Sequence, residues 1–341
     1  MRNVLKAAAR CALFVWLCCA AAGARPVHNY VFFGLGREKI REAASFLSTD
    51  ALEGAQVTYT WRQLEPEKDA YDFGAVREDL AFLTSKGKRL FIQLQDLSFM
   101  ESRVNVPRYL LNDPAYNGGA DKEYEVGEDG DEEHAPVVGW AARRWDPAVQ
   151  ERFHKLLSAL GREFDGRVEG VNLTETSIGF GESGRLFPKG FSFEAYRDGI
   201  ITNMKALRRA FPKSAVIQYA NFMPGEWLPE KDRGYLRAVY KAAKELGVGV
   251  GGPDLLPNRP GQRKHSYPLI RDASGVVTTG VAVQDGNYAD PNRKTGKPPT
   301  VAELLQFATD YLRVDYVFWC TEEPYYSQQV IPFFRQVKRR K

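Results

Sequence analysis

The sequence predicts an α/β fold, a (β/α)8 TIM barrel with a long loop insertion after strand 3. Two observations support this fold class. Eight short runs rich in Val, Ile, Tyr and Phe alternate with segments whose apolar residues recur at helical spacing. This alternation is typical of a parallel sheet with crossover helices. Polar and acidic residues follow most of the runs, and the carboxyl ends of barrel strands form the active face of such a fold.

The eight runs have the length and composition of buried strands. The expected strands are residues 28–36, 55–61, 89–95, 168–174, 215–223, 248–252, 280–284 and 315–320. Between them, apolar residues at helical spacing predict helices at 37–47, 75–83, 149–164, 196–207, 236–246 and 304–311. The sixth helix is the weakest, because residues 253–279 show a Pro-, Arg- and Gly-rich loop with one turn around 267–271.

The first 24 residues differ from the rest of the chain. Arg2, Lys6 and Arg10 precede an apolar run at 11–22, and Ala22-Gly-Ala24 follows, as in a secretory signal peptide with its cleavage site. The run is too short to span a membrane. We therefore expect a signal peptide at 1–24 and a single (β/α)8-barrel domain of catalytic type at 25–341. The mature protein is expected to be exported, periplasmic or secreted, and without a membrane partner.

Cleavage of the signal changes both the charge and the cysteine count. It removes three basic residues, which lowers the net charge from +4 to +1 and leaves no basic surface that needs a nucleic acid. Cys320 is then the remaining cysteine, so no internal disulfide is expected. The histidines have no metal-ligand spacing, and neither a serine-hydrolase elbow nor a phosphate-binding glycine loop is present. We expect no metal and no cofactor, and the oligomeric state stays open.

The residues at or just past the strand ends are mostly carboxylates, amides and aromatics. They are Trp61, Arg62, Gln95, Asp96, Glu175, Asn221, Asp254, Asp285, Trp319, Glu322 and Glu323. Glycosidic bond cleavage needs one carboxylic acid to protonate the leaving oxygen and a second carboxylate as nucleophile or base. Flat apolar faces stack against sugar rings, and polar side chains bind hydroxyls. The set therefore predicts a carbohydrate substrate, with Trp61 and Trp319 as sugar platforms and Arg62, Gln95, Asp96, Asn221 and Asp254 as substrate ligands.

One stretch resembles a known enzyme group. Residues 60–73 read Thr-Trp-Arg-Gln-Leu-Glu-Pro-Glu-Lys-Asp-Ala-Tyr-Asp-Phe. This is similar to the motif after strand two in the clan A TIM-barrel glycoside hydrolases, the cellulase, xylanase and β-galactosidase-like superfamily, of which the chain looks like a divergent member. The resemblance implies an acid/base glutamate ending strand four, a nucleophilic glutamate ending strand seven and a tryptophan ending strand eight. Glu175 matches the first role and Trp319 the last.

Two positions depart from that pattern. Thr174 stands where the clan usually has the Asn before its acid/base, and strand seven ends Val283-Gln284-Asp285 without a glutamate. The second carboxylate is therefore open between Asp285, which we place first, and Glu322 or Glu323. Plainer interpretations also stand: Glu175 paired with Arg185, a turn-forming Asp285, helix-capping Glu322 and Glu323, and tryptophans in the core.

The predicted function is that of an exported glycoside hydrolase-like protein that cleaves O-glycosidic bonds of a poly- or oligosaccharide by a two-carboxylate mechanism. The alternative is a non-catalytic carbohydrate-binding barrel, because of the missing strand-seven glutamate. The insertion, residues 97–146, contains the acidic segment 121–133. Since like charges repel, we expect this segment to be mobile and its deletion to leave folding intact, with Trp140 or Trp145 beside the cleft.

Overall fold

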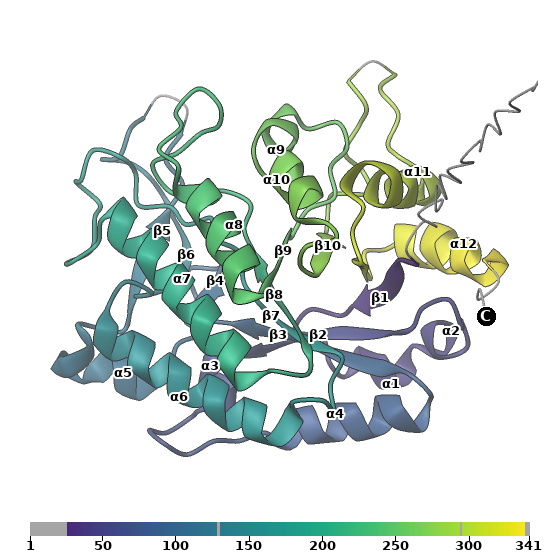
Figure 1. The fold of residues 1–341 in the computed structure, drawn as a ribbon, viewed down its shortest axis with the longest axis horizontal. Helices are drawn as coiled ribbons and strands as arrows, with labels where there is room; N and C mark the ends of the chain where they lie inside the picture. The colour runs from purple at the N-terminus through teal and green to yellow at the C-terminus, as the bar shows by residue number, and fades with distance from the viewer. Residues whose placement is uncertain (1–25, 128–129, 294, 338–341) are drawn as a thin grey trace, which may run out of the picture.

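Eight parallel strands close into a barrel, which confirms the predicted fold class (Figure 1). The computed structural model describes residues 26–127, 130–293 and 295–337, so the predicted signal peptide lies outside the described residues. The strands follow one another around the barrel in chain order, and β1 pairs with β11 to close it. They are β1 (His28–Phe32), β2 (Gly54–Thr60), β3 (Arg89–Gln95), β7 (Gly170–Leu173), β8 (Ala215–Tyr219), β9 (Gly249–Gly252), β10 (Thr279–Val283) and β11 (Tyr316–Cys320).

Helices surround the barrel (Figure 1). They are α1 (Lys39–Glu42), α2 (Ala44–Leu47), α3 (Trp61–Leu64), α4 (Gly74–Ser85), α5 (Arg108–Asn112), α6 (Pro147–Phe164), α7 (Phe193–Ala210), α8 (Tyr235–Leu246), α9 (Pro260–Lys264), α10 (Ser266–Ala273), α11 (Val301–Gln306) and α12 (Ile331–Gln336). A 3-10 turn spans Pro114–Tyr116, and π-helical segments span Phe307–Leu312 and Tyr326–Val330. No helix in the described ranges is long and apolar enough to cross a membrane.

Helical structure fills the sixth crossover, where the sequence indicates a loop with one turn. Pro260 begins α9, because the first turn of a helix does not need its missing N–H. The following helix, α10, buries Tyr267 and Ile270 in the core. The apolar residues at i and i+3 therefore outweigh the loop-like composition around them.

The insertion after β3 contains a small sheet, and the acidic segment 121–133 begins in one of its strands, with residues 128–129 outside the described residues. Strands β4 (Leu97–Ser98), β5 (Ala120–Tyr124) and β6 (Val137–Ala142) form an antiparallel sheet in the order β4-β6-β5. Two of its acidic side chains have cationic partners: Asp121 accepts a hydrogen bond from Arg143 at 2.9 Å, and Glu133 pairs with Arg185 at 2.9 Å. Arg185 thus binds the insertion rather than Glu175. These opposite charges relieve the repulsion that the acidic composition suggests.

Near the amino ends of the strands the barrel interior is filled by aromatic rings, and glycines on neighbouring strands leave the space that these rings occupy. Phe91 packs edge-on against Tyr30 and Phe318. A Cβ atom at Gly170 would lie 2.5 Å from the Phe91 ring, and one at Gly54 would lie 2.4 Å from the Tyr30 ring. The aromatic layer therefore depends on these positions having no side chain.

Polar side chains fill the interior nearer the carboxyl ends of the strands. Gln56 donates to Oδ1 of Asn172 at 2.8 Å, and Thr58 donates to Oε1 of Gln93 at 2.6 Å. These side chains are buried and hydrogen-bonded to one another, as most buried polar groups are. The barrel thus changes from aromatic to polar toward the rim where the predicted site residues lie.

Candidate active site

Glu175 stands two residues beyond β7, the fourth strand of the barrel. Its half-buried side chain accepts a hydrogen bond of 2.6 Å from Nδ2 of Asn221, which follows β8. Burial raises the pKa of Glu175 to about 7; the Asn221 hydrogen bond opposes this rise, and the negative charge of Asp254 adds to it. A carboxyl with this pKa is protonated roughly half the time at neutral pH, as a general acid requires.

Asp254 follows β9, the sixth strand, and is also half-buried. Its Oδ1 accepts a hydrogen bond of 3.0 Å from Nδ2 of Asn287, whose own Oδ1 accepts from the backbone N–H of Leu255 at 2.9 Å. Burial raises the pKa of Asp254 above its ordinary value, while Asn287 lowers it. The rim therefore holds a second oriented carboxyl whose charge acts on Glu175.

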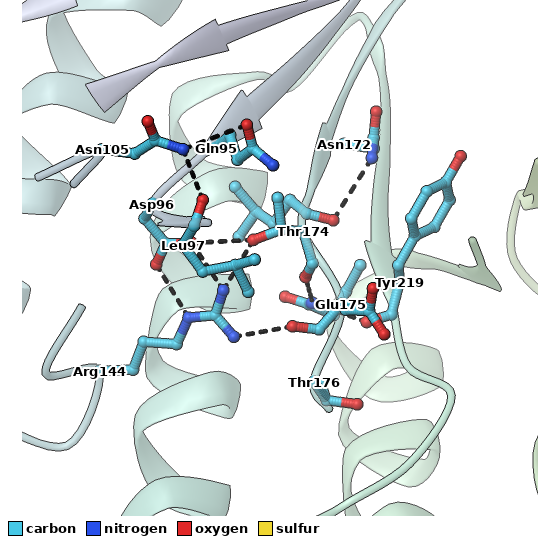
Figure 2. Close-up of polar contacts among 12 residues, drawn as sticks. Gln95, Asp96, Leu97, Asn105, Arg144, Asn172, Thr174, Glu175, Thr176 and Tyr219 are labelled. Carbon is cyan, nitrogen blue, oxygen red and sulfur yellow. Dashed lines mark hydrogen bonds and ion pairs between the residues drawn. The ribbon is translucent and has the colours of Figure 1, made fainter. Parts of the chain in front are cut away.

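A buried ion pair supports the strand end that carries Glu175 (Figure 2). Arg144 donates to both carboxylate oxygens of Asp96, at 2.6 and 2.8 Å, and to Oγ1 of Thr174 at 2.7 Å. It also donates to the backbone carbonyl of Glu175 at 2.8 Å. Burial alone would raise the pKa of Asp96, but the Arg144 charge turns the shift downward. Asp96, predicted as a substrate ligand, thus binds Arg144 with both oxygens and fixes the backbone at Glu175 instead.

Glu123, on β5 of the insertion, is a buried acid near this network that the sequence analysis does not single out. Its side chain is 3% exposed, and its Oε1 has no hydrogen-bond partner among the described residues. Burial raises the pKa of Glu123 to about 8; Arg144 opposes the rise, and the charges of Glu175 and Asp96 add to it. Glu123 is therefore mostly protonated at neutral pH. The Glu123 side chain is buried because of the way β5 packs, and the composition of the sequence does not indicate that packing.

Asp285 and Glu322 meet at the ends of β10 and β11, beside Cys320. Their side-chain oxygens and the Cys320 sulfur lie within 4.8 Å of one another, and in the part of the chain that the structure describes no other such group has metal-binding spacing. Burial raises the pKa of Cys320 to about 12, so its thiol keeps its proton at neutral pH and is a poor metal ligand. Asp285 is exposed, and Glu322 accepts from the backbone N–H of Gly286 at 2.9 Å.

Trp61 and Trp319 lie in the core, which corrects their expected role as sugar platforms. Both are fully buried, with Trp61 packed against Phe153 and Trp319 against Phe334. A ring without exposed surface has no face for a sugar. The reason for Trp319 is the alternation of side chains along a strand: Phe318 points into the barrel, so Trp319 points toward the helices.

The three remaining predicted residues bind other parts of the protein. Arg62 donates from Nε to a backbone carbonyl of the insertion at 2.8 Å. Gln95 accepts a hydrogen bond of 3.3 Å from Asn105 (Figure 2). Glu323 is exposed and accepts from the backbone N–H of Ser327 at 3.2 Å. These contacts agree with structural roles at the rim.

Two aromatic residues on the loop after β8 also escape the sequence analysis. Phe222 is half-buried and Trp227 is 49% exposed, and their rings are stacked with centroids 5.4 Å apart. Only their position after a predicted strand could have indicated these two residues. In a barrel, the loops that follow strands lie on the active face, so a tryptophan in such a loop is a candidate ligand contact.

No family model and no curated protein matches the sequence. Solved structures with a similar fold include the catalytic domain of beta-amylase from Paenibacillus polymyxa, with a TM-score of 0.57 and 8% identity over 87% of this chain and 92% of that one. They also include a GH10 endoxylanase retrieved from sugarcane soil metagenome, with a TM-score of 0.52 and 13% identity over 91% and 89%. A third is GH10 from Paenibacillus barcinonensis, with a TM-score of 0.51 and 14% identity over 87% and 84%.

These similarities concern the fold. The chain has a (β/α)8 barrel like that of the clan A glycoside hydrolases, in agreement with the resemblance of residues 60–73. Sequence identities this low carry no reaction and no substrate from those proteins to this one. Its chemistry has to be argued from its own residues.

Proposed function

We propose that this protein hydrolyses the glycosidic bonds of an oligo- or polysaccharide, with Glu175 as the proton donor and Asp254 as the second carboxylate. One observation carries the proposal: a half-buried glutamate with a pKa of about 7 ends the fourth strand, and a second oriented carboxyl on the same face acts on it electrostatically. Pairs of carboxyls whose environments separate their pKa values are typical of acid and base roles.

The chemistry assigns a different state to each group. Glu175 transfers its proton to the glycosidic oxygen as the bond to the anomeric carbon breaks. Asp254 is ionised, and either takes a proton from the attacking water or forms a bond to the anomeric carbon that water later hydrolyses. Arg144 keeps the Glu175 backbone in place during both steps through its bond to the carbonyl.

Asp254 replaces Asp285 as our first choice for the partner of Glu175. The Asp254 charge contributes to the raised pKa of Glu175. Asp285 is exposed and lies against Cys320 and Glu322. Desolvation strengthens electrostatic stabilisation of a developing positive charge, so the half-buried Asp254 is the better placed of the two. Asp285 and Glu322 remain the alternatives that mutation has to separate.

A non-catalytic carbohydrate-binding barrel is the second candidate. It is favoured by the end of strand seven, where Gln284 and the exposed Asp285 stand instead of a buried glutamate. In that case Glu175, Asn221 and Asp254 would bind sugar hydroxyls without breaking a bond.

The test is hydrolysis of a panel of neutral oligo- and polysaccharides by the purified mature protein. Glu175→Gln keeps the size of the side chain but removes the transferable proton, so we expect a rate loss on the order of 10²–10⁴. Asp254→Asn should lose a similar factor, and the matched variant Asp285→Asn should keep most of the activity. Loss in Asp285→Asn with full activity in Asp254→Asn would reverse the assignment, and binding without hydrolysis would favour the non-catalytic alternative.

We also propose that the protein is exported, on the basis of the signal-like pattern at residues 1–24. The N-terminal sequence of the protein recovered from its producing cells tests this. A mature chain that begins near residue 25 in an extracytoplasmic fraction is expected, and an intact N-terminus in the cytoplasm would contradict export.

A further inference from the structure

The loop after β8 holds an exposed indole in a fixed orientation. The ring of Trp227 stacks on Phe222 with an interplanar angle of 6°, and the buried ring of His265 packs edge-on against it at 4.4 Å. The backbone N–H of Trp227 donates to the Lys231 carbonyl at 2.9 Å. Despite these contacts, 49% of Trp227 is exposed. A preorganised apolar surface therefore faces solvent at this position.

The same loop is attached to the strand end that carries Glu175. Asn221 binds the Glu175 carboxyl at 2.6 Å, and the hydroxyl of Thr176 donates to the carbonyl of Phe222 at 2.6 Å. Two successive residues of the loop thus contact two successive residues after β7. Phe222, the first residue of the aromatic pair, directly follows Asn221, which binds the candidate proton donor Glu175.

Asn221 also provides an independent sign of a ligand. Its side chain is 4% exposed, and its Oδ1 has no hydrogen-bond partner among the described residues. A buried acceptor without a donor destabilises the fold, so such a group points to a ligand or water that satisfies it. Since Nδ2 of Asn221 already binds Glu175, a hydroxyl donated to Oδ1 would belong to a group held directly beside that carboxyl.

Two lysines near the indole have acidic partners. Lys231 pairs with Glu182, and Lys264 on the neighbouring helix α9 pairs with Glu230. A lysine paired with a carboxylate attracts a charged polymer less than a free lysine does. The combination that remains is a flat apolar face next to an unsatisfied hydroxyl acceptor. A neutral sugar chain matches it, because sugar rings present C–H groups on their faces and O–H groups at their edges.

We propose that the loop of residues 221–228 forms a subsite for a neutral oligosaccharide: the unit at Glu175 donates a hydroxyl to Asn221, and a neighbouring unit lies flat on Trp227. This inference rests on the proposed function, because it places one unit at Glu175. It gives Trp227, with Phe222 behind it, the platform role that the sequence suggested for Trp61 and Trp319.

Binding of neutral xylo-, cello-, manno- and malto-oligosaccharides, measured by titration calorimetry on a Glu175→Gln background, tests the subsite. That background prevents hydrolysis during the measurement. Adding Trp227→Ala should raise the dissociation constant for the bound oligosaccharide by about tenfold or more, and tenfold is equivalent to about 1.4 kcal/mol. Trp227→Phe should retain much of the affinity. Phe82→Ala, a half-buried aromatic on the outer helix α4, is the matched control and should change nothing.

The outcomes separate the two proposals. Oligosaccharide binding that is unchanged in Trp227→Ala would overturn the subsite and leave the proposed function standing. The absence of binding and hydrolysis for every sugar would overturn both. An unchanged melting temperature of Trp227→Ala shows that any loss of affinity is local.

Discussion

Glu175 is subject to two opposing effects. Burial disfavours its charged form, while the hydrogen bond from Asn221 stabilises that form, and the balance leaves a pKa of about 7. Because this pKa lies above the unfolded value, the stability that the protonated carboxyl contributes is complete below the unfolded pKa and is lost as the pH rises from there through about 7. Such a cost is common where a side chain is retained for function.

The pH dependence of kcat/KM should be bell-shaped. Activity rises as Asp254 loses its proton, above the ordinary range for an aspartate, and falls above about pH 7 as Glu175 loses its own. In Asn221→Leu the bond that stabilises the Glu175 carboxylate is absent, so its pKa rises and the alkaline limb moves to higher pH. Activity should also be lower throughout. An alkaline limb that stays in place or moves to lower pH would contradict the role assigned to Asn221.

Glu123 should make stability depend on pH in the same direction. Its folded pKa of about 8 is raised above the unfolded value, so its stabilising contribution is complete at low pH and is lost as the pH rises through about 8. We expect Glu123→Gln to be more stable than the wild type near pH 9 by on the order of 1–3 kcal/mol, and similar to it near pH 5. Urea unfolding at both pH values measures this. The same difference at both would show that ionisation is not the cause.

At the scale of secondary structure, the barrel strands were predictable and the insertion was not. Buried parallel strands are continuous apolar runs, and most of the predicted bounds agree with the structure within two residues. The strands predicted at 28–36 and 215–223 end four residues early, because aromatic residues continue into the loops. In the insertion, the acidic composition hides a small sheet, and two of the acidic residues, Asp121 and Glu133, pair with Arg143 and Arg185, which are distant in sequence.

The site shows the same division. Glu175, Asn221 and Asp254 were predictable because each follows a strand, and the structure connects the three by a hydrogen bond and a charge interaction. Glu123 and Trp227 were not, because their directions depend on tertiary packing. No motif in the sequence marks either residue.

Deleting residues 121–133 should destabilise the protein, contrary to the expectation from composition. The deletion removes most of β5. It also removes Asp121, which pairs with the buried Arg143, and the buried side chain of Glu123. With a short Gly-Ser linker in place of the segment, we expect the melting temperature to fall by at least about 5 °C. Calorimetry at neutral pH measures it, and an unchanged transition would mean that the small sheet does not stabilise the barrel.

For the whole molecule, the aromatic rings inside the barrel limit which side chains the neighbouring strand positions can accommodate. Gly170→Ala would place a Cβ 2.5 Å from the Phe91 ring and 2.7 Å from the Ala215 carbonyl oxygen, so one side must move. We expect a loss of about 1–3 kcal/mol in the free energy of unfolding. Gly252→Ala is the control, because its Cβ would meet nothing nearer than 4.0 Å. Equal stability of the two variants would contradict the tight packing of this layer.

The central claim is that Glu175 gives its proton to the leaving oxygen, and the dependence on the leaving group tests it most directly. The measurement compares kcat/KM of wild type and Glu175→Gln on two substrates with the same sugar. One has a sugar as leaving group, which needs a proton, and the other has a dinitrophenolate, which leaves without one. We predict a loss on the order of 10²–10⁴ for the first and less than about tenfold for the second. Equal losses on both substrates, or no loss on either, would contradict Glu175 as the general acid.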